Sequence, residues 1–183
     1  PEEHIRALNE KPELLKSCGR PAIDTQVEIR DENDNPLPIG EIGQICAKGP
    51  QIMKGYWNKK EESEKALKGG WMHTGDAGRM DEEGFVFIQD RIKDMIVSGG
   101  ENIYSTEVEA ALFAHPDVVD AAVIGVPDEK YGEVVKACIV KKEGSNITEA
   151  DLISFCKDRI ASYKKPQSVD FIDEVPRLSL IHI

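Results

Sequence analysis

The sequence lacks the usual marks of a secreted, metal-binding or membrane-spanning protein. It holds four cysteines in 183 residues, and no two of them have the C-x-x-C spacing of metal and redox motifs. We therefore expect free thiols in a reducing compartment. No apolar run approaches the roughly 20 residues of a membrane-spanning helix, and the N-terminal residues do not resemble an apolar signal segment. These absences predict a cytoplasmic protein with no transmembrane segment and no metal site.

Positive charge is also scarce in this chain. Lys and Arg number 23 against 34 Asp and Glu, which gives a net charge of −11 and a pI near 4.9. Nucleic acids and anionic membranes select basic surfaces, so neither is expected as a partner. A local cationic site for a phosphate group stays compatible with this balance. The hydrophobic share of 40% and the charged share of 31% are typical of globular domains.

The first part of the chain has the pattern of antiparallel β-structure. Val27 and Ile29 alternate with charged residues, and turn-forming residues follow them. Asn58 is predicted to cap a short helix that runs through Ala66. We predict strands over residues 27–30, 42–47 and 85–89, with turns at 31–36 and 81–84.

After Lys93 the pattern changes to alternating strands and helices. The predicted strands cover residues 95–97, 118–126, 134–141 and 168–172, and the predicted helices begin at Ser105 or Thr106 and at about Thr148. This order predicts an α+β domain with its helices on one sheet. We place the two domains at residues 1–90 and 91–183.

Two segments contain residues suited to chemistry, at 71–76 (WMHTGD) and 90–109 (DRIKDMIVSGGENIYSTEVE). Asp76 follows a glycine turn, where a carboxylate can accept hydrogen bonds from both hydroxyls of a ribose. The alternative is a β-turn whose Thr and Asp bond the local backbone. Arg91 has a planar fork that suits ribose or phosphate oxygens. Its alternative is a surface ion pair with Asp90.

The same stretch contains a pair of adjacent glycines, Gly99 and Gly100. Glycine adopts positive φ and lets another molecule approach closely, because it has no Cβ. The alternative is a simple turn. The basic segment 163–166 could face the phosphate groups of a ligand, and its alternative is a solvated helix end. For Lys93 the alternative to any functional role is a solvated lysine.

Together, these segments resemble the adenylate-forming (AMP-binding) enzymes, and most of all the acyl-CoA synthetases of the fatty-acid–CoA ligase type. The resemblance extends over about residues 17–177. Residues 40–57 and 125–133 resemble segments of that family whose role is architectural. The fold that the resemblance implies is a small antiparallel β subdomain at the end of a large domain, followed by a mobile α+β C-terminal domain.

The resemblance also implies roles for single residues. Asp76 and Arg91 match the nucleotide-binding positions. Trp71 matches an aromatic residue that the family commonly has just ahead of the Asp76 segment. Lys93 matches the hinge about which the small domain rotates between two catalytic poses. Gly99 and Gly100 match the loop that lines the coenzyme A tunnel.

The activity implied is that of an ATP-dependent carboxylate–CoA ligase, which uses ATP, coenzyme A and Mg²⁺. A fatty acid is the expected carboxylate. Two alternatives stay open, an adenylation domain that loads a carrier protein and a non-catalytic module that binds a nucleotide or a partner protein. The sequence carries no prediction of the oligomeric state.

Several family features are missing from these 183 residues. No Ser/Thr/Gly-rich phosphate loop is present, and family members are considerably longer. The family's catalytic lysine belongs to a Gly-Lys pair, but its expected positions hold Ile181 and His182. We therefore assign no catalytic residue. The chain is expected to be a C-terminal fragment that forms no acyl-AMP by itself.

Overall fold

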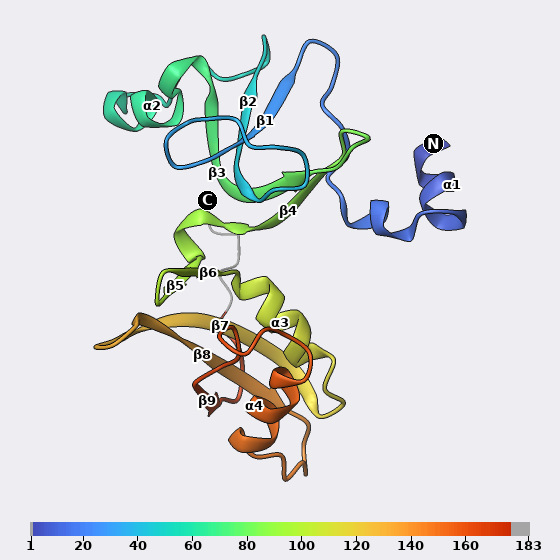
Figure 1. Cartoon of the computed structure of the whole chain (residues 1–183), viewed down its shortest axis with the longest axis vertical. Helices are drawn as coiled ribbons and strands as arrows, with labels where there is room; N and C mark the ends of the chain where they lie inside the picture. Colours follow the sequence, from blue (N-terminus) through green and yellow to red (C-terminus); the bar gives the residue numbers. More distant parts are fainter. Residues whose placement is uncertain (1, 177–183) are drawn as a thin grey trace. The chain divides into compact units, whose positions relative to one another are not determined.

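The computed structural model describes residues 2–176 (Figure 1). The chain divides into two compact units, Pro1–Lys93 and Asp94–Ile183. Each unit combines helices with a mainly antiparallel sheet, which confirms the predicted α+β class. The assignment of residues 1–90 and 91–183 to a large-domain part and a mobile small domain stays a prediction.

The sheet of the first unit is an antiparallel meander, in which each strand pairs with the next along the chain. Its strands are β1 (Gln26–Arg30), β2 (Gly43–Lys48), β3 (Met72–Met80) and β4 (Val86–Arg91). The sequence did not predict β3, because a glycine such as Gly75 is typical of a turn and interrupts the pattern of a strand. In the structure Gly75 has a φ of +80° within the strand, so the strand is irregular but continuous.

Short helices surround this sheet. They are α1 (Glu2–Asn9), η1 (Pro12–Lys16), α2 (Lys60–Ala66), η2 (Lys68–Gly70) and η3 (Ile92–Asp94). The predicted cap of α2 was wrong. Asn58 has a φ of +54°, and the N-cap position belongs to Lys59, which makes no side-chain capping bond. Asn tolerates the left-handed region better than most residues, so it serves here in the turn before the helix.

A compact ion-pair network holds α1 and η1 to the turn between β3 and β4. The Glu83 carboxylate accepts hydrogen bonds from Arg6 at 2.5 and 2.9 Å and from Lys11 Nζ at 2.6 Å. These two partners, Arg6 first, lower the pKa of Glu83 to about 2. A small apolar cluster lies in the same region, formed by Ala7, Leu14, Phe85 and Phe87.

The second unit is built on a five-stranded sheet with the order β6-β5-β8-β7, in which β9 also pairs with β8. The strands are β5 (Ile96–Ser98), β6 (Glu101–Ile103), β7 (Val118–Asp128), β8 (Gly132–Lys141) and β9 (Ser168–Phe171). All neighbours are antiparallel except β8 and β9. Figure 1 shows α3 and α4 beside this sheet. The sequence missed β6.

The two helices of this unit begin in different ways. The N-cap of α3 (Ser105–Phe113) is Tyr104, which makes no side-chain capping bond. The prediction of Ser105 or Thr106 at this position was therefore wrong by one or two residues. α4 (Glu149–Lys157) begins with a complete capping box, in which Thr148 and Asp151 bond each other's backbone N–H. Both helices bury apolar side chains against a single core.

Candidate functional site

The two predicted nucleotide-binding residues are direct cross-strand partners. Asp76 at β3 and Arg91 at the end of β4 form a Cα pair in the antiparallel register. Directly opposite residues have their Cβ atoms about 4.5–5.5 Å apart on one face of the sheet. Asp76 is half-buried and Arg91 is exposed. Within residues 2–176 neither side chain forms an ion pair, so the two present opposite charges side by side to solvent.

The backbone around Asp76 is held by the hydroxyl of Thr74. Thr74 Oγ1 donates to the carbonyl of Ile45 at 2.9 Å and accepts from the Asp76 N–H at 3.1 Å. The register of β3 shifts relative to both neighbours, between Gln44 and Cys46 and again after Ala77. Thr74 therefore stabilises the irregular segment that presents Asp76. The sequence alternative of a Thr that bonds the local backbone included the bond to the Asp76 N–H, but not the bond to Ile45, which lies 29 residues away.

His73 is part of a structural polar cluster. Its Nδ1 lies 2.8 Å from Gln44 Oε1, and its Nε2 lies 3.5 Å from Asp34 Oδ1. The other oxygen of that carboxylate, Oδ2, pairs with Lys68 Nζ at 2.5 Å. Cys46 Sγ is 3.5 Å from the same imidazole. Burial raises the pKa of the Cys46 thiol to about 11, so the thiol stays protonated at neutral pH. The cluster therefore lacks the thiolate of a nucleophilic Cys–His pair.

Trp71 is a packing residue in this structure. It is buried, with the Arg30 guanidinium 4.3 Å and the Lys48 ammonium 5.7 Å from its ring centroid. Cation–π contacts of this kind stabilise the indole where it lies. Trp71 therefore stabilises the start of β3 by packing.

Lys93 lies in η3, where the first unit ends. Its side chain is exposed, and no ion pair within residues 2–176 involves it. A hinge residue absorbs a change in backbone dihedrals at the junction of two bodies. Lys93 occupies such a junction in the chain, and its role as a hinge stays a prediction.

Gly99 and Gly100 form the two-residue turn between β5 and β6. Their φ values are +61° and +88°, which confirms the positive φ predicted for both. Two positive φ angles in a two-residue hairpin loop are the signature of a type I′ turn, where Gly-Gly is favoured. A Cβ on Gly100 would meet no atom within 4 Å, whereas one on Gly99 would lie 3.3 Å from Tyr131 Cδ1. The turn therefore presents open backbone at Gly100.

The basic segment 163–166 contains a paired lysine. Lys164 Nζ donates to both carboxylate oxygens of Glu107 at 2.7 and 2.9 Å, from the start of α3. Pro166 is fully buried. Lys164 is therefore neither a solvated helix end nor available to a phosphate in this structure. This ion pair cannot be predicted from local sequence, because Glu107 and Lys164 are 57 residues apart.

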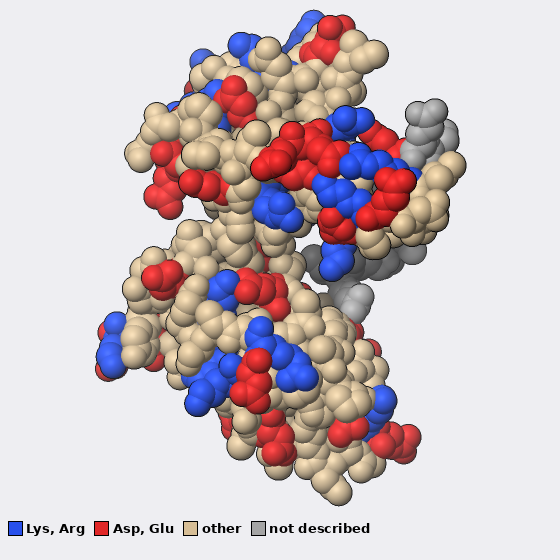
Figure 2. Space-filling model, turned by 45° about the vertical axis from the view of Figure 1, so that its right-hand side comes forward, with Lys and Arg blue, Asp and Glu red and all other residues tan. Residues whose placement is uncertain are grey.

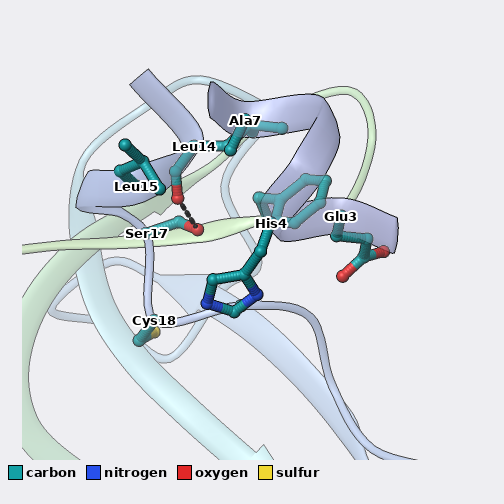
Figure 3. Close-up of a pocket in the computed structure, with 9 residues that line it drawn as sticks. Glu3, His4, Ala7, Leu14, Leu15, Ser17 and Cys18 are labelled. Carbon is teal, nitrogen blue, oxygen red and sulfur yellow. Dashed lines mark hydrogen bonds between the residues drawn. The ribbon is translucent and has the colours of Figure 1, made fainter. Parts of the chain in front are cut away.

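A separate cavity lies between α1, η1, residues 17–19 and Phe85, the residue before β4. It measures about 310 Å³ and contains none of the predicted site residues. Figure 3 shows its wall, where Glu3, His4 and Ala7 come from α1 and Leu14 from η1. The Ser17 hydroxyl donates to the Leu14 carbonyl at 2.7 Å. This cavity therefore belongs to the packing of the N-terminal helices.

Surface charge and side-chain clustering, in the part of the chain that the structure describes, bear on whether another class of site is present. Figure 2 shows acidic and basic side chains interspersed on the face in view. Among residues 2–176, no three His, Cys, Asp or Glu side chains gather closely enough to hold a metal ion. In the same part of the chain, no helix has the length and apolar character needed to cross a membrane.

Comparison with known families identifies the chain. Residues 4–57 match the family model of the AMP-binding enzymes, and residues 107–179 match that of the AMP-binding enzyme C-terminal domain. The chain belongs to the AMP-binding enzyme family. The resemblance seen in the sequence is thereby confirmed.

Curated relatives of this family member are CoA ligases and synthases. A feruloyl-CoA synthase from an Amycolatopsis species is 45% identical over 164 residues, which is 90% of this chain and 33% of that protein. A long-chain-fatty-acid–CoA ligase from Escherichia coli is 45% identical over 161 residues, or 88% of this chain and 28% of that protein. The chain thus spans about a third of the length of the curated relatives it matches.

Solved structures show the same fold. The ATP-bound MatB of Rhodopseudomonas palustris superimposes with a TM-score of 0.85 at 38% identity, over 90% of this chain and 33% of that one. The o-succinylbenzoate CoA synthetase of Bacillus subtilis, in complex with its acyl-adenylate intermediate, gives 0.83 at 37% identity, over 94% and 34%. Sequence and fold therefore lead to the same family.

Proposed function

We propose that this chain is part of an ATP-dependent carboxylate–CoA ligase. The carboxylate attacks the α-phosphate of ATP, which forms acyl-AMP and releases pyrophosphate. The thiol of coenzyme A then attacks the acyl carbon, which forms acyl-CoA and releases AMP. The observation that carries the proposal is the cross-strand pairing of Asp76 and Arg91, which were each predicted to bind nucleotide from separate segments.

The charges of this pair suit a nucleotide. The Asp76 carboxylate is an acceptor for the two vicinal hydroxyls of a ribose, and the Arg91 guanidinium is a donor to ribose or phosphate oxygens. A related structure is described as a complex with ATP and magnesium ion. We propose that Mg²⁺ enters with the triphosphate, and we assign no described residue to it.

The second unit supplies the proposed thioester step. The turn of Gly99 and Gly100 leaves open backbone at Gly100 for the approach of coenzyme A, and Lys93 is the proposed hinge between the two steps. Ile181 and His182 lie outside the described residues, and no catalytic residue is assigned. A cytoplasmic location is part of the proposal, because all four cysteines are unpaired.

A fatty acid is the proposed acyl substrate class. The long-chain-fatty-acid–CoA ligases among the relatives support it, whereas the feruloyl-CoA and 2-succinylbenzoate–CoA enzymes show that similar chains serve other carboxylates. A panel of carboxylates of each kind therefore belongs in the first assay.

The proposal is tested on the complete protein that contains these residues, by carboxylate-dependent exchange of pyrophosphate into ATP. Asp76→Asn should lower kcat/KM for ATP by about 10- to 100-fold, because it removes a charged acceptor of hydrogen bonds. Glu82→Gln is a matched control, since Glu82 is an exposed carboxylate near the same strands. Wild-type protein without exchange activity, or full activity in the Asp76→Asn variant, would overturn the proposal.

A further inference from the structure

The glycine turn is anchored to the rest of its sheet by two hydrogen bonds. The Gly99 N–H donates to the carbonyl of Tyr131 at 2.9 Å, and the Val97 N–H donates to Glu133 Oε2 at 3.0 Å. Both acceptors belong to the end of the hairpin formed by β7 and β8. The first acceptor is the backbone carbonyl of Tyr131, and the second is the side-chain carboxylate of Glu133. These two hydrogen bonds are called the anchors of the turn.

The Glu133 carboxylate stands where a regular strand pairing would have a carbonyl. β5 and β8 share a single Cα pair, Ser98 with Gly132. In a regular antiparallel ladder the bonded pair at Gly99 and Tyr131 would be followed, two residues on, by a bonded pair at Val97 and Glu133. The carboxylate accepts the Val97 N–H at that place, so it extends a very short ladder.

Gly125 on β7 provides the room for this carboxylate. A Cβ at Gly125 would lie 3.1 Å from Glu133 Oε2, 3.2 Å from its Cδ and 3.3 Å from Ile96 Cγ1. The φ of Gly125 is not in the positive range, so a side chain here would be opposed by the close approach of Glu133 rather than by backbone conformation. The sequence singled out Gly125 and Glu133 in one architectural segment, and this contact gives the two residues a common role.

The hairpin end that carries the anchors is itself ordered by Asp128. Its Oδ1 accepts the N–H groups of Lys130 at 2.9 Å and Tyr131 at 2.8 Å. The backbone that presents the Tyr131 carbonyl and leads into Glu133 is therefore fixed. A turn of two glycines has high conformational freedom of its own, so its position depends on what it is tied to.

We infer that Glu133 is a positioning residue for the turn at Gly99 and Gly100, and through it for the transfer of the acyl group to coenzyme A. This inference rests on the proposed function, which puts the coenzyme A contact at that turn. The proposed nucleotide contacts, Asp76 and Arg91, lie in the other unit. Loss of the anchor should therefore impair the thioester step and spare the formation of acyl-AMP.

The test measures the two steps separately in the complete protein. Glu133→Ala should raise KM for coenzyme A, or slow single-turnover transfer from preformed acyl-AMP, by about tenfold. Pyrophosphate exchange should stay within about twofold of the wild-type rate by the same argument. Glu133→Gln keeps an acceptor oxygen and should recover most of the loss. Glu129→Ala removes an exposed carboxylate from the same hairpin end and should change neither step.

A second variant removes the anchor without altering Glu133. Gly125→Ala should displace the carboxylate and reproduce the selective loss, and hydrogen exchange at the Val97 amide should rise in both Glu133→Ala and Gly125→Ala. An unchanged coenzyme A step in Glu133→Ala, or an equal loss in both steps, would overturn the inference while leaving the proposed function intact. Wild-type protein that forms no acyl-AMP would overturn the proposed function, and the inference with it.

Discussion

The two units of this chain bury apolar side chains in different ways. The second unit has one core cluster of fifteen buried residues, drawn from five strands and both helices as well as the loop residue Ile147. The first unit has two small clusters, of four and of three residues. Apolar burial is the main favourable term in folding. The second unit therefore depends on its core, whereas the first needs additional contacts.

Those additional contacts in the first unit involve charged groups. Besides the Glu83 network, Arg79 lies 4.4 Å from the ring centroid of Phe87, and Arg20 lies 5.0 Å from that of Phe85. Added salt screens ion pairs near the surface, and low pH removes the charge of their carboxylates. Neither change has much effect on the burial of apolar side chains. The stability of the first unit is therefore expected to depend more on solution conditions.

The same contrast extends to the proposed sites. Asp76 and Arg91 are placed by strand pairing, in which the backbone sets their separation. The segment around the turn at Gly99 and Gly100 is tied to β8 and the residue before it by one Cα pair and two hydrogen bonds, one of which ends on a side chain. Variants in the first site should therefore change ligand contacts, and variants around the second should change the position of a loop.

The largest expected effect that separates the units comes from the core of the second. Leu152 is fully buried in its cluster. Leu152→Ala should lower the free energy of unfolding of this unit by about 2–5 kcal/mol, because it removes apolar contacts and leaves a cavity. Both tryptophans, Trp57 and Trp71, lie in the first unit. The midpoint of urea unfolding in Leu152→Ala should therefore fall when it is followed by circular dichroism. It should stay at the wild-type value when it is followed by tryptophan fluorescence.

Phe113→Ala provides the control for that experiment, because Phe113 is 47% exposed in the same unit. It should shift the circular-dichroism transition far less. If Leu152→Ala shifted the tryptophan-detected transition as much as the circular-dichroism transition, the two units would unfold as one.

A smaller effect is expected at the start of α4. Thr148→Ala removes the hydroxyl that accepts the Asp151 N–H at 3.3 Å and should cost about 0.5–2 kcal/mol in the unfolding free energy of the second unit. Ser154→Ala, at an exposed position within the same helix, is the matched control. Equal stability of the Thr148→Ala and Ser154→Ala proteins would contradict a stabilising role for the capping box.

The smallest effect, and the one most sensitive to pH, is expected at Glu83. Its pKa falls from 4.5 to about 2 in the folded chain, so its contribution to stability is complete above about pH 4.5 and disappears as the pH falls through 2. Glu83→Gln should lower the stability of the first unit at neutral pH and flatten this pH dependence. Tryptophan-detected urea unfolding between pH 7 and 2 measures both effects.

Glu82→Gln is the control for that series, because its side chain is exposed on the same turn. Added salt should reduce the difference between Glu83→Gln and the wild type. A difference that persists unchanged at high salt would argue that Glu83 acts by packing rather than by charge.

Much of the fold follows from local patterns. Residue alternation predicted β1, turn-forming residues marked the starts of β2 and β4, and the spacing of apolar residues predicted both helices of the second unit. Local signals also misled at Gly75, which lies within β3, and at Asn58, which precedes α2 by a turn. A glycine or an asparagine suits a turn, a strand irregularity or a helix start, and the local sequence does not distinguish these places. Contacts with distant parts of the chain decided both positions.

By itself, the sequence determined the α+β class, the family, and the residue types that suit a nucleotide and a glycine turn. Only the tertiary structure decided which of these residues meet. Asp76 faces Arg91 because β3 and β4 pair in one register, and Glu133 reaches Val97 across a separation of 36 residues. Strand register depends on which faces are buried against the rest of the fold. That information is spread over the whole chain, so no single motif contains it.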